Sequence, residues 1–145
     1  MKKKNLFYKI KRYHVKLWSA KIIPHMVTNK ARLFFYRLIG YKNISKKAFI
    51  GMRCYLDDLE PKMLIVEDNV TISYGVFFSC HGYKQKHHSI TIKEGSYIGM
   101  RTTLLAHEEN GLTIGKNAVV GACSFVNKNV PDNETWAGVP AKKIK

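Results

Sequence analysis

Between residues 44 and 131 an apolar residue returns every six positions, and this period constrains the fold more than any other feature of the 145-residue sequence. Three consecutive hexads form an 18-residue unit, and four such units follow one another with short insertions between them. The twelve hexads begin with Ile44, Ile50, Leu56, Val66, Ile72, Phe78, Ile92, Ile98, Leu104, Ile114, Val120 and Val126. A period of six fits neither an amphipathic helix nor an alternating strand, and self-similarity at a fixed spacing indicates a solenoid.

The fifth position is small or β-branched in the first two hexads of every unit. It is occupied by Ala48, Cys54, Val70, Val76, Ser96, Thr102, Ala118 and Ser124. We expect each hexad to form one short strand and a corner, so that three hexads close one turn of a triangular prism whose coils lie about 4.8 Å apart. The insertions at 62–65, 84–91 and 110–113 all follow a third hexad, so these loops should leave from one corner. The sequence therefore predicts a mainly β protein, a parallel β-helix of about four coils over residues 44–131.

A basic helical prefix is predicted over residues 1–43. The first 56 residues contain fifteen Lys and Arg and no acidic residue, whereas residues 57–145 contain ten of each sign. One face of a first predicted helix, ending before Pro24, carries Leu6, Ile10, Tyr13 and Leu17. A second helix is expected from a cap at Thr28 to a stop at Gly40.

Two interpretations of this prefix are compatible with each other. Its apolar face could pack on the first coil and cover an otherwise exposed solenoid end. Residues 1–40 could also lie on an anionic membrane surface, where basic side chains are attracted to lipid headgroups. A nucleic-acid partner is not predicted, because the repeats carry no basic stripe and no recognition motif is present. No run of apolar residues has the length of a signal peptide or a membrane span, so we expect a cytoplasmic protein.

The tandem hexads, the sequence SCHGY and the closing run AVVGACSFVNKNVPDNETWAGVPAKKI resemble the left-handed β-helix acyltransferases of the galactoside, maltose and polysaccharide O-acetyltransferase type. The resemblance covers residues 44–145. Its most specific part is the ending, where VNKNVP and WAGVPAK are similar to the family's V-T-K-D-V-P and A-G-V/N-P-A-K/R. It implies a left-handed β-helix and a C-terminal tail at 132–145 that closes a coenzyme A groove.

The resemblance places His81 where the family carries the histidine that deprotonates the acceptor. A neutral imidazole suits this task, because it can take a hydroxyl proton at pH 7 and release it again. The sequence offers no Ser, His and Asp arrangement for a covalent acyl-enzyme, so we expect the acceptor to attack the thioester directly. SCHGY departs from the commoner T-H-E or S-H-D, since Gly82 stands where an acid often lies. The residue that orients the imidazole is therefore left open, as is a reading of His81 as an exposed loop histidine.

Two further residues are candidates for the acceptor site. Asp58, in the acidic pair with Asp57, is at a position similar to the aspartates that contact acceptor hydroxyls in the galactoside enzyme, although LDDLEP also reads as an ordinary polar turn. His107 occupies the same hexad position as His81 one unit later. The acidic pair at 108–109 that follows it could orient His81, or the whole loop could form a substrate lip.

The donor implied by the resemblance is acetyl-CoA, bound in a groove between neighbouring prisms. The matching positions are Met100, Ala122, Asn127, Lys128, Lys142 and Lys145. The lysines would act as point charges for phosphates, and the N–H of Met100 could stabilise the thioester oxyanion. Asn127 replaces the usual threonine, and the alternative is a generic charged tail. Because such grooves are built from two chains, the resemblance implies a homotrimer.

No metal site is predicted. The cysteines Cys54, Cys80 and Cys123 show no CxxC spacing and are expected as packing residues. The γ-class carbonic anhydrases share the fold and bind zinc, but His81, His87, His88 and His107 do not follow their histidine pattern.

The sequence thus favours an acetyl-CoA-dependent O-acetyltransferase that acts on a sugar hydroxyl, with a polysaccharide or glycolipid precursor as the carbohydrate acceptor. The alternatives are an N-acetyltransferase acting on an amino sugar, and a catalytically silent β-helix that serves as a binding or assembly module.

Overall fold

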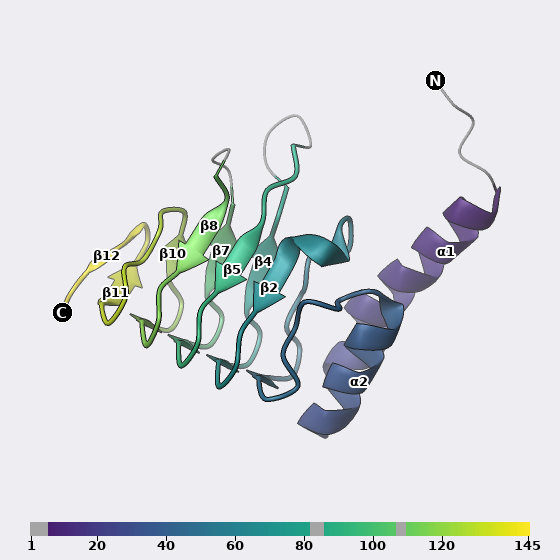
Figure 1. Ribbon diagram of the computed structural model, residues 1–145, viewed down its shortest axis with the longest axis horizontal. Helices are drawn as coiled ribbons and strands as arrows, with labels where there is room; N and C mark the ends of the chain where they lie inside the picture. Colours follow the sequence, from purple (N-terminus) through teal and green to yellow (C-terminus); the bar gives the residue numbers. More distant parts are fainter. Residues whose placement is uncertain (1–5, 82–85, 107–109) are drawn as a thin grey trace.

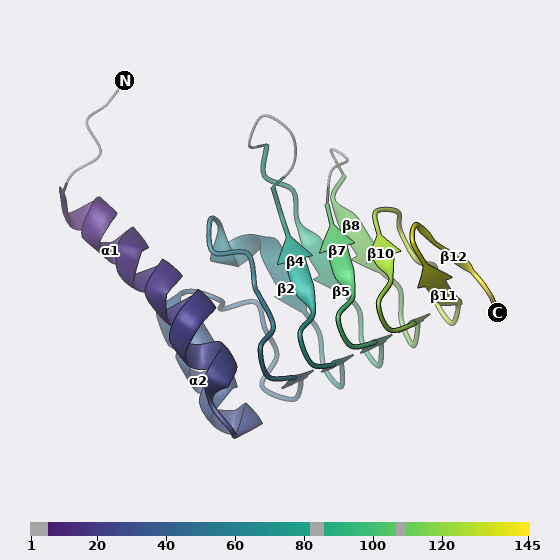
Figure 2. The same ribbon diagram turned by 180° about the vertical axis from the view of Figure 1, so that it is seen from behind.

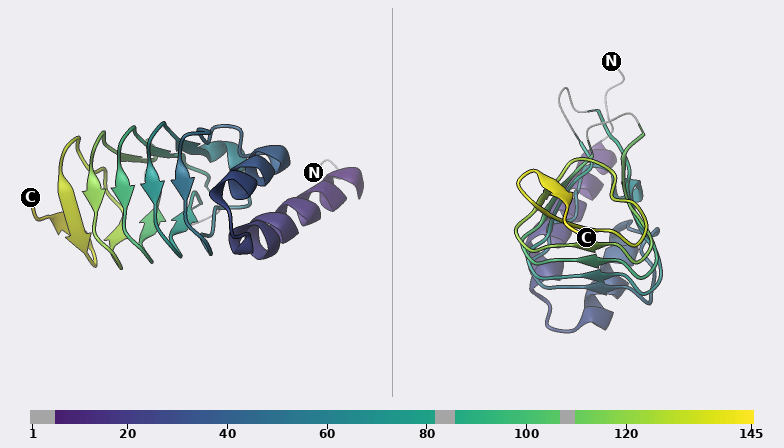
Figure 3. Two further views of the ribbon diagram at one scale, coloured as in Figure 1. Left: turned by 90° about the horizontal axis from the view of Figure 1, so that it is seen from below. Right: turned by 90° about the vertical axis from the view of Figure 1, so that its left-hand side faces the viewer.

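The computed structural model describes residues 6–81, 86–106 and 110–145, and their coils stack into a parallel β-helix (Figure 1). One face of the prism contains β1 (Phe49–Ile50), β3 (Thr71–Ile72), β6 (Tyr97–Ile98) and β9 (Val119–Val120). A second face contains β4 (Phe77–Ser79), β7 (Thr103–Leu105) and β10 (Phe125–Val126), and the third contains β2 (Leu64–Val66), β5 (Ile90–Ile92) and β8 (Leu112–Ile114). A view along the prism shows the coils superimposed (Figure 3). The predicted β-helix is confirmed.

The hexad register is preserved from coil to coil. On the first face, residues 49, 71, 97 and 119 align one above another in parallel pairing. All twelve residues that begin a hexad are buried, and so are the eight residues predicted as the small fifth position. Where the fifth residue is polar its hydroxyl is bonded, as for Ser96, which donates to the Gly115 carbonyl at 2.7 Å. Bonding of this kind offsets the cost of burying a polar group.

The corners depend on a position that the sequence analysis did not single out. The fourth residue of seven hexads adopts a positive φ, namely Arg53, Asn69, Gly75, Gly95, Arg101, Asn117 and Cys123. Glycine and asparagine tolerate this left-handed conformation best. His81 is also a fourth residue, but at the corner from which the longer connections leave.

The predicted helical prefix is present. It consists of α1 (Leu6–Leu17), a π-helical turn (Trp18–Ile22), a 3-10 turn (Ile23–His25) and α2 (Asn29–Ile39). The Thr28 hydroxyl accepts from the Ala31 N–H, and Gly40 ends α2 with φ 130°. Both predicted helix boundaries of α2 are therefore confirmed.

The helix α2 covers the open edge of the first coil (Figures 1 and 2). The Asn29 amide donates to the Ala48 carbonyl at 3.0 Å and accepts from the Ile50 N–H at 2.9 Å, so it replaces a neighbouring strand. Buried Arg32 donates from Nε to the Ile50 carbonyl at 2.9 Å, and burial lowers its pKa. An unpaired strand edge is a site of aggregation, and these side chains satisfy it.

For α1 the predicted packing on the first coil is wrong. Leu6, Ile10, Tyr13 and Leu17, the predicted apolar face, remain 69%, 48%, 65% and 36% exposed. The contact with α2 is made by the π-helical turn that follows α1, where the ring of Trp18 stacks on Phe35 at 5.6 Å. The apolar face of α1 is therefore free in the single chain.

Two neighbouring tyrosines under α2 allow a matched test of stability. The rings of Tyr36 and Tyr41 pack edge to face at 5.4 Å, and both residues are fully buried. The Tyr36 hydroxyl has no hydrogen-bond partner among the described residues, whereas Tyr41 donates to the Leu56 and Asp57 carbonyls at 2.9 and 3.1 Å.

Tyr36→Phe should leave the free energy of unfolding unchanged or raise it, because it removes a buried hydroxyl that lacks a partner. Tyr41→Phe should lower that free energy by about 1 to 2 kcal/mol, since it leaves buried carbonyls without a donor. Denaturant titration of the two variants measures both effects. A larger loss for Tyr36→Phe than for Tyr41→Phe would contradict this assignment.

The C-terminal residues extend the prism. The strand β11 (Thr135–Gly138) pairs in parallel with β9, and β12 (Ala141–Lys143) pairs antiparallel with β11. Residues 135–138 thus continue the first face, and the tail does not hang free.

Candidate active site

Strand alternation places the candidate base on the outer surface of the prism. Phe78 and Cys80 point inward and are buried, so Phe77, Ser79 and His81 point outward. On the preceding coil Tyr55 pairs with Phe77, and their rings stack at 4.5 Å. By the same alternation Asp57 lies on this outer face, next to Ser79 and close to His81.

Asp57 binds His81 directly. His81 Nδ1 lies 2.5 Å from Asp57 Oδ2. The Asp57 side chain is 1% exposed and that of His81 is 33% exposed. The same carboxylate accepts from the Cys80 N–H at 2.7 Å and from the Leu59 N–H at 3.0 Å. Asp57 is therefore held in place by two backbone donors while it contacts the imidazole.

This geometry fixes the role of each ring nitrogen. A carboxylate only accepts hydrogen bonds, so Nδ1 carries the proton and donates it toward Asp57. The lone pair then lies on Nε2, the nitrogen that can accept a proton from a bound hydroxyl. When Nε2 becomes protonated, the adjacent negative charge stabilises the imidazolium. The pair can thus act as a general base with a fixed tautomer.

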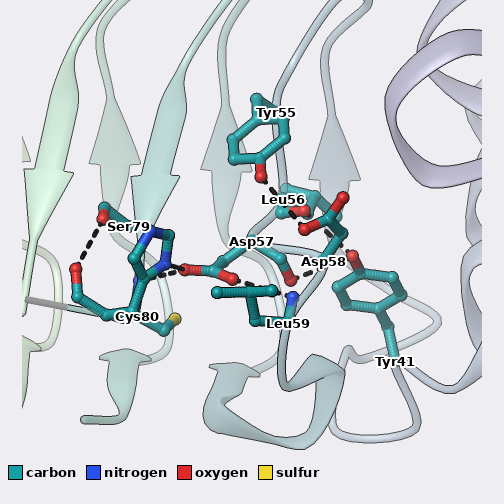
Figure 4. A network of polar contacts seen from close by, with 9 residues as sticks. Tyr41, Tyr55, Leu56, Asp57, Asp58, Leu59, Ser79 and Cys80 are labelled. Atoms are coloured by element: carbon teal, nitrogen blue, oxygen red, sulfur yellow. Dashed lines mark hydrogen bonds and ion pairs between the residues drawn. The ribbon is translucent and has the colours of Figure 1, made fainter. Parts of the chain in front are cut away.

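A network of tyrosines supports this pair (Figure 4). The Tyr41 hydroxyl donates to the Asp57 carbonyl, which anchors the backbone of that residue under α2. The Tyr55 hydroxyl donates to Asp58 Oδ1 at 3.2 Å. Burial, with the nearby Asp58 and Asp57, raises the pKa of Tyr55 to about 12, so it remains a donor near neutral pH.

Cys80 is not equipped to act as a nucleophile. Burial and the adjacent Asp57 raise the pKa of its thiol to about 12. A thiolate is the reactive form of cysteine, so the environment keeps Cys80 inert. It is a packing residue, as predicted.

Sequence reasoning missed the role of Asp57. It sought the partner of His81 on the following coil, in the acidic pair at 108–109. That pair and the candidate His107 lie outside the described residues. The partner comes from the preceding coil. The signal was available, because Asp57 and Ser79 are both second residues of a third hexad and must be neighbours in register. Asp58, the acidic residue chosen for acceptor binding, contacts Tyr55 and stays a prediction for that role.

The candidate donor residues lie apart from His81, towards another corner and the C-terminal end. Met100 and Ala122 are the third residues of their hexads, and both are exposed at the corner between the first two faces. Ala137, which pairs with Lys142, lies next to Gly121 at the same corner. Lys128, Lys142 and Lys145 are exposed, and no carboxylate pairs with them in the part of the chain that the structure describes. Asn127 is partly buried on the last coil.

The corner carries a repeated backbone pattern. The Arg101 N–H donates to the Tyr74 carbonyl at 2.9 Å, and the Cys123 N–H donates to the Met100 carbonyl at 2.8 Å. The N–H groups of Tyr74, Met100 and Ala122 themselves have no partner among residues 6–81, 86–106 and 110–145. They form a row of one free donor per coil, suited to an extended polar ligand.

His81 and this corner are separated within one chain. Tyr74, which lies below Met100, and His81 stand at opposite ends of the second face, with the turn at Gly75 and the strand β4 between them. The candidate base and the candidate donor residues therefore lie at different corners of the prism.

None of the described residues forms a group of three or more His, Cys, Asp or Glu side chains able to hold a metal ion.

Comparison with known proteins finds acetyltransferases among the relatives of this chain. A serine acetyltransferase of Bacillus pumilus (strain SAFR-032) is 27% identical over 139 residues, with 88% of this chain and 62% of the relative covered. The galactoside O-acetyltransferase of Escherichia coli (strain K12) is 34% identical over 119 residues, with 72% of this chain and 57% of the relative covered. The chain therefore spans less than two thirds of the length of these relatives. No protein-family model matches the chain.

The fold has a close counterpart among solved structures. A hexapeptide-repeat-containing acetyltransferase from Vibrio cholerae superimposes with a TM-score of 0.68 at 20% identity, covering 97% of this chain and 93% of that one. This likeness bears on the fold alone, and it agrees with the hexads and with the relatives above. The chain is thus similar to the hexapeptide-repeat acyltransferases, and it folds, like them, as a left-handed β-helix.

Proposed function

We propose that the protein is an acetyl-CoA-dependent O-acetyltransferase that transfers the acetyl group directly to a sugar hydroxyl. The observation that carries this proposal is the Asp57–His81 pair, in which a buried carboxylate fixes the tautomer of a partly exposed imidazole. A positioned base of this kind contributes typically 10²- to 10⁴-fold to a rate.

The reaction proceeds in one addition and one elimination. His81 Nε2 removes the proton of the acceptor hydroxyl while its oxygen attacks the thioester carbonyl. The tetrahedral intermediate carries its negative charge on the former carbonyl oxygen, where a backbone N–H such as that of Met100 stabilises it. The intermediate then collapses, the carbon–sulfur bond breaks, and the imidazolium returns the proton to the departing coenzyme A sulfur.

The donor is proposed to lie along the corner of Met100 and Ala122. The free N–H groups of this corner would bond the amides of the pantetheine arm, and Lys142 and Lys145, with Lys128 on the last coil, would meet the phosphates as point charges. Asn127 would contribute a polar contact beside Lys128.

A homotrimer is part of the proposal, and the placement of His81 and the donor corner at different corners of the prism supports it. The base of one copy would then work with the donor corner of its neighbour. Tyr97 and Phe77 on the outer faces are each 44% exposed, and apolar side chains of this size are suited to a contact between subunits.

A sugar is the favoured acceptor because the aromatic pair Tyr55–Phe77 lies on the same outer face as Asp57 and His81. Aromatic rings offer an apolar surface with a polar edge. An amino sugar and serine are the alternatives, the latter because a serine acetyltransferase is among the relatives.

The transfer assay separates these alternatives. Purified protein, acetyl-CoA and a panel of neutral sugars, amino sugars and serine should give coenzyme A release that depends on a sugar. The product should be an ester that hydroxylamine cleaves, whereas an amide from N-acetylation resists it. Preferred acetylation of serine would contradict the sugar assignment, and no transfer to any acceptor would support a silent binding module.

A peripheral contact of α1 with an anionic membrane surface, in the cytoplasm, is part of the proposal. The exposed residues Leu6, Ile10, Tyr13 and Leu17 form an apolar stripe on a helix whose other residues include Lys9, Lys11, Arg12 and Lys16. This combination is typical of helices that lie in a membrane interface. No helix formed by the described residues combines the length and hydropathy of a bilayer-spanning segment.

A further inference from the structure

The helix α2 packs at the end of the prism opposite the C-terminus (Figure 3). A groove lies beside its contact with the first coil. One face of the helix lines it with residues at helical spacing, from Asn29 and Lys30 through Leu33, Phe34 and Arg37 to Leu38. The opposite wall is the segment 46–49 of the first coil. Its volume is about 710 Å³, within the range of sites for small molecules.

The polar lining of this groove is almost entirely basic. It contains Lys30, Arg37, Lys46 and Lys47 and no acidic residue. Lys47 pairs with Asp68 at 2.8 Å, and Arg37 donates to the Lys42 and Ile44 carbonyls. Lys30 and Lys46 are exposed and have no carboxylate partner in the described part of the chain. The two ammonium groups are available for an anion.

The remaining lining is apolar and open to solvent. Phe34 and Leu38 are 63% and 68% exposed, and Phe49 across the groove is 46% exposed. Large apolar side chains gathered in this way on a monomer indicate an interaction site. Cations beside an apolar channel fit a ligand with one anionic end and one hydrocarbon end, which neither a free sugar nor coenzyme A provides.

We propose that this groove binds one molecule of an anionic phospholipid. Its phosphate contacts Lys30 and Lys46, and the first part of an acyl chain lies along Phe34, Leu38 and Phe49. This inference rests on the proposed membrane contact of α1 and names the lipid chemistry that the surface selects.

The test uses the full-length protein and monomeric dihexanoyl-phosphatidylglycerol, with binding followed by titration calorimetry or nuclear magnetic resonance. Wild type should bind one lipid per chain saturably, and both dihexanoyl-phosphatidylcholine and glycerol 3-phosphate should bind more weakly. Lys30→Gln/Lys46→Gln should weaken binding about 10- to 30-fold, because each removes one charge from the phosphate site. Phe34→Gln/Leu38→Gln should weaken it to a similar degree.

The matched control is Lys93→Gln/Lys116→Gln, which removes the same charge from later coils and should bind like wild type. Equal weakening in this control, or equal binding of the neutral lipid, would overturn the proposal in favour of non-specific attraction. A change of oligomeric state in either groove variant would also overturn it, since the groove would then be a contact between copies.

A separate arm distinguishes this site from the membrane contact of α1. Leu6→Gln/Tyr13→Gln should lose binding to vesicles that contain phosphatidylglycerol while it retains the short-chain lipid. If wild type does not bind such vesicles but binds the short-chain lipid, the proposed membrane contact of α1 is wrong and the proposed lipid site in the groove is supported. Absence of any short-chain binding by wild type overturns the groove itself.

Discussion

Replacing His81 with Ala should lower kcat/KM for acetyl transfer roughly 10²- to 10⁴-fold, the usual contribution of a positioned general base. The protein should stay folded, because the imidazole is one-third exposed and the buried Asp57 carboxylate keeps its two backbone donors. Steady-state kinetics with an acceptor that the wild type acetylates measure this loss.

The companion change Asp57→Asn tests whether the pair acts as a unit. Asparagine keeps the shape but can present an N–H to Nδ1, which reverses the tautomer of His81. A loss of about 10²-fold or more is expected, by analogy with the effect of such a change in a triad. The double variant should be little worse than His81→Ala alone, because residues of one catalytic unit are not additive.

The matched controls are His25→Ala and Asp58→Asn. His25 is an exposed histidine of the prefix, and its loss should leave turnover unchanged. Asp58 accepts from Tyr55 and not from His81, so its change should alter the KM for the acceptor more than kcat. Additive effects of the His81 and Asp57 changes would show that the two residues act independently.

The fold could be predicted from the sequence because the six-residue period determines which residues face the interior. Any shift of the hexads would move residues such as Ile72 or Phe78 from the interior to the surface, so burial selects one register. The helix α2 was readable for a similar reason, since its cap at Thr28 and its stop at Gly40 are local signals. The position of α1 was not, because helical periodicity reveals an apolar face without revealing what covers it.

The site was only partly readable for a physical reason. His81 was found because its place in the hexad is local information, but its partner Asp57 lies 24 residues earlier and meets it through the stacking of coils. The identity of the partner depends on which neighbouring coil supplies it, and the insertion after each third hexad obscures that choice. Register across Tyr55 and Phe77 resolves it.

An active site shared between two subunits predicts an even larger change in activity than the single substitutions do. One variant, His81→Ala, lacks the general base. The other, Ala122→Glu/Lys142→Glu, should prevent acetyl-CoA from binding, because the carboxylate at 122 obstructs the path of the pantetheine arm and both carboxylates repel the phosphates. Each variant alone should be at least about 10²-fold less active than wild type. After subunit exchange by co-refolding, a mixture of the two inactive proteins should regain activity.

The expected recovery follows from the pairing of chains in a closed ring. If His81 of one copy works with the donor corner of its neighbour, a site functions when the first chain is the corner variant and the second is the His81 variant. When the two variants assemble at random from equal concentrations, each of the two chains that share a site is the required variant with a probability of about one half. About one quarter of the sites in a cyclic trimer should therefore be active. The unexchanged mixture is the control and should stay inactive.

The recovered fraction distinguishes two architectures that the single chain leaves open. His81 and the donor corner lie at different corners of one chain, and only a site shared between chains can be rebuilt from two defective ones. If subunit exchange is complete by mass spectrometry and the mixture remains inactive, one chain must hold both halves of the site. The assignment of Met100, Ala122 and Lys142 to the donor would then be wrong, and the acetyl group would have to approach His81 along its own face of the prism.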